Sequence, residues 1–401
     1  MYYKAIRTKL KLNNTQATLM AKHAGYSRWV YNWGLRLWSE GYKDGLKPSA
    51  NVLKKLFTNH VKPLFPWMGE LSSRVYQYAF ISLGDAFKRF FKKLRAGTRS
   101  RLRLGGYPNF KRKGLHDSFT IDNTGKPIQI GGLRHKLPFL GWVRTHEALP
   151  ECLTKKLTIS CQASDWYLSF HIEMPDLEPT PKTVDVVGVD LGISSLATLS
   201  TGVVFPNLKP YARAKQRLAR LQQAVSGKIK GSNNRKKAIL KLAGHHRRVG
   251  SIRNDAIHKI TSYLAQNHSR IVIEDLNVAG LLSNHKLAGA ISDCGFGEFR
   301  RQLEYKCARY GCELLMADSF YPSSQLCSCC GIRQKMPLKV RVYDCLNCGL
   351  LIDRDLNAAI NLSNWGRLAP GSLPRVNRSH APNEAESKHP CPDMSGKVSV
   401  L

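Results

Sequence analysis

Acidic residues are scarce in this chain of 401 residues: 28 Asp and Glu stand against 62 Lys and Arg, which gives a formal net charge of +34. Self-repulsion on this scale destabilises a compact state unless a polyanion binds, so we expect nucleic acid or, as the competing alternative, an anionic membrane surface. No apolar run approaches the ~20 residues of a membrane span, and no lipidation signal is present. We therefore expect a nucleic-acid partner and no membrane.

A secretory signal is also missing from the N-terminus. The first residues, MYYKAIRTKL, alternate polar and apolar side chains like a strand and contain no long apolar run. We expect a cytoplasmic protein, and in that compartment eleven cysteines favour metal binding over disulfides. Six cysteines are scattered and are expected to be core residues or bystanders: Cys152, Cys161, Cys294, Cys307, Cys312 and Cys391.

Four further cysteines form two Cys-x-x-Cys pairs separated by fourteen residues: Cys327 and Cys330, then Cys345 and Cys348. Four thiolates satisfy Zn²⁺ tetrahedrally, and Gly331 and Gly349 permit the tight turn that each pair needs. The spacing predicts a structural Zn²⁺ site rather than a redox dithiol, and a closed shell of thiolates predicts a role in folding. Cys329 lacks both the two-residue gap and the trailing glycine, so we expect it not to bind the metal.

The chain from residue 14 to about residue 95 has helical spacing. Within 15–42 and 72–95, aromatic side chains recur every three or four residues. The core of a helix bundle is the favoured interpretation of these aromatics, with base stacking as the alternative.

Segment 87–114 contains eleven basic residues interleaved with Phe and Tyr, and it contains no acid. A solvated helix face usually balances its lysines with glutamates, so contact with phosphates is the favoured interpretation. Gly105, Gly106 and Pro108 break the helix and mark a domain boundary. The nucleic-acid-binding candidates are Lys88, Arg89, Lys92, Lys93, Arg95, Lys111, Arg112 and Lys113.

The next part of the chain has strand character. Short apolar-polar runs bounded by turn residues predict a small barrel or sandwich, with strands at 118–123, 126–132, 135–145, 155–162 and 165–174. A Pro-rich linker follows at 175–183.

Strands and helices alternate beyond the linker. Apolar runs at 184–192, 270–278 and 312–319 predict strands, and 210–265 and 295–311 predict helices. This order indicates an α/β domain whose strands bury both faces. From Gly366 onward the composition is rich in Pro, Ser, Asn and His without periodicity, so we expect a disordered tail.

Two buried strands of this domain end in acids, Asp190 after VVGV and Glu274 after RIVI. Ligand sites of α/β sheets lie at the carboxyl ends of their strands, although a loop cap for Asp190 and an ion pair for Glu274 are the simpler alternatives. Divalent cations such as Mg²⁺ require oxygen ligands, and acids that converge in a basic protein need a cation to offset their repulsion. The two acids and one aspartate of 353-DRDLNAAINL-362 would supply such a site.

The two aspartates of that last segment cannot contribute equally. An apolar stripe that includes Leu356 and Ala359 predicts a short helix beginning near Asp355. Residues two apart point in different directions, so one carboxylate faces the metal and the other faces away. We expect Asp355 to face the metal and Asp353 to cap the helix or to form an ion pair with a nearby basic side chain.

Several motifs resemble the TnpB (OrfB) family of bacterial insertion sequences: GVDLGI, VIEDLN, SDCGFGEFRRQLEYK, SSQLCSCCG, YDCLNCG and DRDLNAAINL. GGYPNFKRKG and IQIGGLRHKLPFLGWVRTH match farther upstream. The resemblance covers the chain to about residue 365. It implies that Asp190, Glu274 and Asp355 are the catalytic carboxylates, which hold two Mg²⁺ ions.

The resemblance also implies the fold class, α/β plus α and β. A ribonuclease H-like (RuvC) nuclease domain is expected at 181–365 with a zinc-ribbon insert at 323–350. A small wedge-like β-barrel is expected at 1–13 and 110–180, a helix-turn-helix-like recognition lobe at 14–109, and the tail at 366–401.

The implied activity is RNA-guided cleavage of double-stranded DNA that is complementary to a transposon-derived guide RNA, in support of transposon maintenance. The expected location is the bacterial cytoplasm, in association with the nucleoid. Two rivals are an accessory DNA-binding regulator of transposition that cleaves nothing, and a transposase that performs strand transfer. The regulator would tolerate loss of Asp190, whereas strand transfer needs transposon ends and no RNA.

Overall fold

The computed structural model describes residues 2–95, 106–115, 117–174, 182, 184–337 and 339–368. The chain divides into two compact units, Met1–Pro175 and Asp176–Leu401. Each unit contains its own sheet and its own helices. Apart from residue 182, the linker expected at 175–183 lies outside the described residues, as does the tail beyond residue 368.

The helices of the first unit occupy the segment for which the sequence predicts them. They are α1 (Asn14–Lys43), α2 (Ala50–Leu56), a π-turn η1 (Phe57–Val61), the 3₁₀ turns η2 (Lys62–Leu64) and η3 (Pro66–Glu70), and α3 (Ser73–Arg95). Asn13 begins α1 through a capping box with Gln16. Many of the aromatics are fully buried between the helices, which confirms the core interpretation for Tyr26, Phe80 and Phe87.

The sheet of the first unit has six strands in the order β2-β5-β6-β1-β4-β3. The strands are β1 (Tyr2–Lys11), β2 (Ser118–Asp122), β3 (Ile128–Leu137), β4 (Gly141–Thr154), β5 (Lys156–Gln162) and β6 (Asp165–Met174). All pairings are antiparallel, and β1 joins β6 to β4. The strands β2 and β3 stand at the two ends of this order, so closure into a barrel stays a prediction.

One predicted strand of this sheet, 135–145, is wrong. The predicted strand contains a turn: β3 ends at Leu137 and β4 begins at Gly141. Phe139 and Gly141 have positive φ angles of 65° and 74°, which place the turn between two hydrogen-bonded strands. Apolar residues on both sides of the turn concealed it in the sequence.

The second unit is built on a five-stranded mixed sheet in the order β11-β10-β7-β8-β9. The strands are β7 (Val184–Asp190), β8 (Ser195–Leu199), β9 (Val204–Pro206), β10 (His268–Glu274) and β11 (Glu313–Ala317). The first three form an antiparallel meander, and β10 and β11 run parallel to β7. The alternation of strands and helices predicted from the sequence is confirmed.

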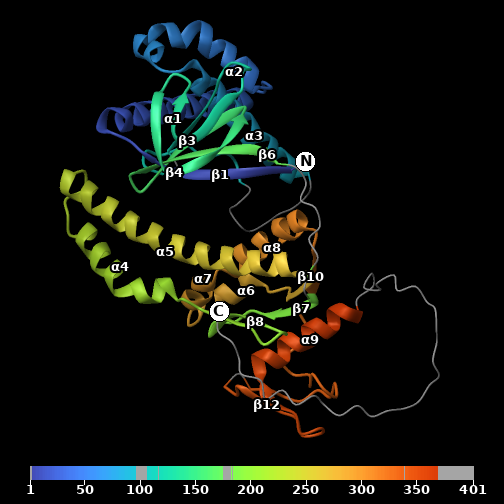
Figure 1. Ribbon diagram of the computed structural model, residues 1–401. Helices are drawn as coiled ribbons and strands as arrows, with labels where there is room; N and C mark the ends of the chain where they lie inside the picture. The colour runs from blue at the N-terminus through green and yellow to red at the C-terminus, as the bar shows by residue number, and fades with distance from the viewer. Residues whose placement is uncertain are drawn as a thin grey trace, which may run out of the picture. The chain divides into compact units, whose positions relative to one another are not determined.

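Helices cover both faces of this sheet (Figure 1). The long pair α4 (Pro210–Ser226) and α5 (Asn233–Asn267) follows β9, and α6 (Val278–Ser283), α7 (Ala288–Cys294) and α8 (Phe296–Tyr310) follow β10. The helices α5 and α8 pack on one face, and α9 (Arg354–Leu368) packs on the other. Although α5 has 35 residues, no described helix has the length and apolar character that a membrane crossing requires.

The helix α9 approaches the sheet unusually closely, and two glycines make this possible. A Cβ atom on Gly188 of β7 would lie 2.0 Å from the carbonyl oxygen of Ala359, and one on Gly366 would lie 2.3 Å from Val272. Gly366 is therefore packed inside a helix that continues to Leu368. The prediction of disorder from residue 366 is wrong for residues 366–368, because helix–sheet packing there outweighs the polar composition.

Candidate active site and metal centre

The two strand-end acids lie side by side at one edge of the sheet. The strands β7 and β10 are parallel neighbours, and Val189 pairs with Ile273. The next residue of each strand is Asp190 or Glu274, so both carboxylates leave the sheet at the same level. This is the carboxyl edge, where α/β sheets place their ligand sites.

The third acid reaches this edge from α9. Asp355 lies in the first turn of that helix, which packs against β7 and β10. Asp353 precedes the helix, and its Oδ1 accepts hydrogen bonds from the backbone N–H groups of Asp355 and Leu356 at 2.9 and 3.0 Å. Asp353 is thus the cap of α9, one of the two roles expected for it, and the cap fixes the direction in which Asp355 leaves the helix.

The electrostatics show that Asp190 is affected by the charges of the other two acids. Burial raises the pKa of Asp190 well above its usual range, and the charges of Glu274 and Asp355 raise that pKa further. Burial and then the charge of Asp353 raise the pKa of Asp355, whereas Arg341 and Arg354 lower it. A buried acid whose pKa is raised by neighbouring acids is a feature of functional sites and attracts a cation.

Two residues at this edge were not identified from the sequence. Ser323, in the connection after β11, donates a hydrogen bond from its hydroxyl to Oε1 of Glu274. Arg341 lies just before the small strand β12 (Val342–Asp344), and its Nη1 is 3.7 Å from Oδ1 of Asp355. Neither residue has a distinctive spacing, and only the folded chain brings them to the acids. Ser323 is the first residue of the SSQLCSCCG motif, but nothing in that motif indicates a contact with Glu274, and Arg341 belongs to no quoted motif.

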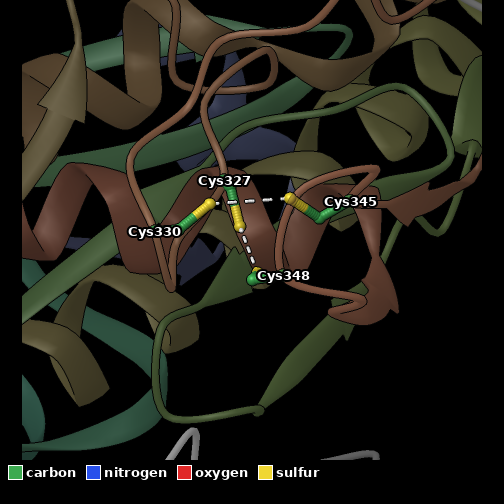
Figure 2. Close-up of side chains that lie close together, drawn as sticks. All are labelled: Cys327, Cys330, Cys345 and Cys348. Carbon is green, nitrogen blue, oxygen red and sulfur yellow. Dashed lines mark hydrogen bonds between the residues drawn. The ribbon is translucent and has the colours of Figure 1, made fainter. Parts of the chain in front are cut away.

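The four paired cysteines converge as their spacing predicts (Figure 2). Their sulfur atoms all lie within 4.8 Å of one another, with 3.6 Å between Cys327 and Cys348 and 3.6 Å between Cys330 and Cys345. Thiolates ~2.3 Å from a tetrahedral Zn²⁺ ion stand ~3.8 Å apart, so the observed spacing suits that ion. Cys329 is exposed and does not belong to the cluster.

Both cysteine pairs are held by the same backbone turn. The N–H of Gly331 donates to the carbonyl of Cys327 at 3.0 Å, and the N–H of Gly349 donates to that of Cys345 at 2.9 Å. Both glycines have positive φ angles, 74° and 72°, which other residues rarely adopt. Within the cluster, a backbone hydrogen bond from Ile332 lowers the pKa of Cys330 to about 6, whereas burial raises the pKa of Cys327 to about 12.

The cysteine module is attached to α9 by two buried asparagines. Asn357 donates to the carbonyl of Leu326 at 2.6 Å and accepts from the N–H of Ser328 at 2.9 Å. Asn361, one turn farther along, donates to the carbonyls of Leu326 and Ser323 at 2.7 and 2.8 Å. The segment that carries Cys327 therefore docks on the same helix that presents Asp355.

The predicted nucleic-acid-binding residues of the first unit differ in their surroundings. Lys88, Arg89, Lys92, Lys93 and Arg95 are exposed on the last turns of α3, and Arg112 and Lys113 are also exposed. Lys111 is more enclosed: its ammonium lies 4.2 Å from the ring centre of Tyr31, and burial lowers its pKa. Lys111 thus has a packing role within the unit, whatever else it contacts.

The second unit carries a further basic surface, on α4 and the first half of α5, in a part of the chain that contains no acidic residue. Between Asp190 and Asp255 the chain has no acidic residue. Exposed basic side chains occur along both long helices: Arg213, Lys215, Arg217 and Arg220 on α4, and Lys236, Lys237, Lys241 and Arg248 on α5. Such a helical pair is suited to contact with the phosphates of a nucleic acid.

Comparison with known families gives three matches along the chain. The family model described as "Probable transposase" (OrfB, IS605) matches residues 169–285, and a "Cas12f1-like, TNB domain" model matches residues 296–362. A helix-turn-helix model of the same OrfB family matches residues 1–47. Together the matches include the strand-end acids, α9 and the cysteine module.

Individual proteins are similar over almost the whole chain. A "Putative RNA-guided DNA endonuclease" of Streptomyces pristinaespiralis is 37% identical over 91% of this chain and 90% of its own length. "Putative RNA-guided DNA endonuclease InsQ" of Escherichia coli K12 is 31% identical over 93% and 95%. Among solved structures, the Cas12f1–sgRNA–target DNA complex contains a protein chain with the same overall fold, with a TM-score of 0.53, 15% identity and coverage of 88% of this chain and 83% of that one.

Proposed function

The chain belongs to the TnpB (OrfB) family of transposon-encoded RNA-guided DNA endonucleases, and from this premise we propose that it hydrolyses DNA at Asp190, Glu274 and Asp355. The observation that carries the proposal is the convergence of these three carboxylates from two parallel strands and one helix. The partners are a guide RNA derived from the transposon and a double-stranded target DNA. The expected place of action is the bacterial nucleoid.

The topology supports a ribonuclease H-like (RuvC) nuclease domain. An antiparallel meander of three strands is followed by two strands parallel to the first, and the candidate catalytic acids stand at the carboxyl edge. The cysteine module inserted between β11 and α9 corresponds to the proposed zinc ribbon. Within that arrangement Asp190 lies at the centre of the sheet, with Glu274 on the adjacent strand.

The carboxylates suit divalent cations such as Mg²⁺ because they are hard oxygen ligands whose charges oppose one another. Two bound Mg²⁺ ions would supply an activated water and would stabilise the attacking and leaving oxygens of the phosphodiester. The chain's own contribution is to hold the acids in place: β7 and β10 fix Asp190 and Glu274, and the Asp353 cap fixes Asp355. Ser323 donates a hydrogen bond to one oxygen of Glu274.

The four thiolates suit Zn²⁺, and we propose a structural role for that ion. The cysteines leave no position for substrate in a tetrahedral shell. The hydrogen bonds of Asn357 and Asn361 would then connect the folded module to α9.

The decisive experiment is cleavage by the protein expressed together with its own transposon end. The purified protein should carry an RNA longer than about 50 nucleotides, because both basic regions have far more positive charge than one short duplex needs. The complex should cut DNA that matches the guide segment of that RNA in the presence of Mg²⁺. Specific cleavage by a preparation free of nucleic acid would refute the proposal. A fully active Asp190→Asn variant would show that these carboxylates carry out neither hydrolysis nor strand transfer.

A further inference from the structure

The residue that contacts Glu274 is itself held from two sides. Ser323 is 2% exposed, and its hydroxyl donates to Oε1 of Glu274. Its carbonyl accepts a hydrogen bond from Asn361 Nδ2 at 2.8 Å, and its N–H donates to the carbonyl of Tyr321 at 2.9 Å. A buried hydroxyl with a fixed backbone has little freedom to move away from the carboxylate that it contacts.

The same asparagine connects Ser323 to the cysteine module. Besides Ser323, the side chain of Asn361 binds the carbonyl of Leu326, which is directly before Cys327. Asn357 binds Leu326 as well, and it also binds the N–H of Ser328, directly after Cys327. Asn357 is fully buried and Asn361 is 4% exposed, so departure of this segment would leave two buried amides without partners. The docking is therefore specific.

We propose that Ser323 is a positioning residue for Glu274, and that the cysteine module sets its position through Asn357 and Asn361. This inference rests on the proposed function, in which Glu274 binds the catalytic Mg²⁺. It assigns a second consequence to the proposed zinc ion, since an ion that shapes the turn at Cys327 also fixes the chain that carries Ser323.

The physical reason is the orientation of a metal ligand. A carboxylate at a strand end can rotate about its side-chain bonds, and each rotation moves the oxygen that would face the cation. A donor that occupies Oε1 leaves Oε2 for the cation and removes most of that freedom. Partners of this kind change metal affinity or activity by about 10- to 100-fold when they are lost.

The chain offers a matched control on the same connection. Ser319 donates to the backbone carbonyl of Asp275 at 2.8 Å, and among the described residues it has no hydrogen bond to Glu274. It lies four residues before Ser323 in the same connection, and substitution with alanine removes the same hydroxyl oxygen. A difference between the two serine variants therefore reports on the contact with Glu274.

The experiment compares Ser323→Ala, Ser323→Thr and Ser319→Ala as complexes with guide RNA. Single-turnover cleavage is measured over a range of Mg²⁺ concentrations, together with target-DNA affinity, zinc content and melting temperature. We expect Ser323→Ala to raise the Mg²⁺ concentration for half-maximal cleavage about 10-fold or more. Zinc content and target affinity should be unchanged. Ser323→Thr should restore the Mg²⁺ dependence, and Ser319→Ala should match the parent protein.

A second variant tests the connection to the cysteine module. Asn361→Ala should shift the Mg²⁺ dependence in the same direction as Ser323→Ala while it retains zinc, because it releases the carbonyl of Ser323. If Asn361→Ala does not fold, the pair of serine variants still decides the assignment of Ser323. Equal Mg²⁺ dependence of Ser323→Ala and Ser319→Ala would overturn the inference.

Failure of the inference can be separated from failure of the proposed function by Glu274→Gln. A cleaving Glu274→Gln variant would refute the proposed role of Glu274 and, with it, the inference. An inactive Glu274→Gln variant beside a fully normal Ser323→Ala variant would refute only the positioning role.

Discussion

The second unit contains two candidate metal sites that differ in how their ligands are brought together. The four thiols lie within 4.8 Å of one another, whereas the three carboxylates do not form so tight a cluster among the described residues. The thiols are arranged by two local turns, and the carboxylates by elements far apart in the sequence. The first site is local in origin, and the second depends on the fold.

The largest expected effect tests the carboxylate site. Asp355→Asn removes a ligand charge at nearly constant volume and should lower cleavage by at least ~10³-fold while RNA and target binding persist. Asp353→Asn is the matched control, since its side chain caps α9 and points to backbone N–H groups. It should keep measurable cleavage and lose less than about 1 kcal/mol of stability.

Parallel cleavage assays in Mg²⁺ decide between the two aspartates. An active Asp355→Asn enzyme would show that the role assigned to this residue is wrong. An inactive Asp353→Asn enzyme with a normal melting temperature would show that Asp353, which is assigned here as the helix cap, is a metal ligand.

The contrast between the two sites also explains what could be predicted from the sequence. The four cysteines were identified from spacing alone, because a Cys-x-x-Cys-Gly turn requires nothing beyond its own residues. Asp190 and Glu274 were identified because each directly follows an apolar strand, and register then placed them side by side. Ser323 and Arg341 reach the acids only through the path of the chain after β11, and although Ser323 opens the SSQLCSCCG motif, that motif does not indicate its contact with Glu274.

The fold shows the same division between local and long-range causes. Helical spacing predicted α1 and α3, and alternation predicted most strands of the first unit. The sequence does not predict the turn at Pro138–Leu140 because apolar residues flank it. It does not predict the last residues of α9 either, because Gly366 continues the helix by packing closely against Val272, in a strand far away in the sequence. Such errors arise where tertiary packing outweighs local composition.

The next prediction concerns the thiol site. Cys345→Ser should release one equivalent of zinc and loosen the module around β12 and β13 (Leu351–Asp353), because the free energy of metal binding there contributes to folding. Cys329→Ser removes a thiol outside the cluster and should leave the metal in place. Elemental analysis and limited proteolysis of the two variants measure these effects. Zinc loss from Cys329→Ser alone would reverse the assignment of ligands.

A smaller effect is expected when the approach of α9 to the sheet is obstructed. Gly188→Ala would place a Cβ atom 2.0 Å from the backbone oxygen of Ala359, so the helix that carries Asp355 has to shift. We expect a loss of about 1–3 kcal/mol in stability and reduced cleavage, without loss of zinc. Gly244→Ala is the control: nothing lies within 4 Å of its Cβ in α5, so it should stabilise the protein by up to about 1 kcal/mol. Thermal unfolding of both variants provides the comparison.

The smallest expected effect links the carboxylate site to pH. The pKa of Asp190 is raised in the folded chain by burial and by its neighbours, so the folded state binds more protons than the unfolded state between the ordinary carboxyl pKa of ~3.9 and the raised value. Metal-free protein should therefore lose stability as pH rises through that window. It should not recover this stability above the window, where both states are ionised but only the folded state crowds the charges.

Added Mg²⁺ should offset this loss, because it binds the ionised acids of the folded state alone. The gain in melting temperature on addition of Mg²⁺ should be about 2–4 °C near neutral pH and smaller at about pH 5, where protons compete for the same oxygens. Asp190→Asn carries no titrating group at this position, so its gain should be smaller and should vary less with pH, and the remaining pH dependence is that of Asp355. The thiol site supplies the internal comparison, since Cys345→Ser removes zinc but retains all three acids. Its response to Mg²⁺ should be weaker, because the module no longer fixes the chain that carries Ser323, but it should still depend on pH. A gain that is equal at both pH values in the parent protein would show that the acids do not share a cation.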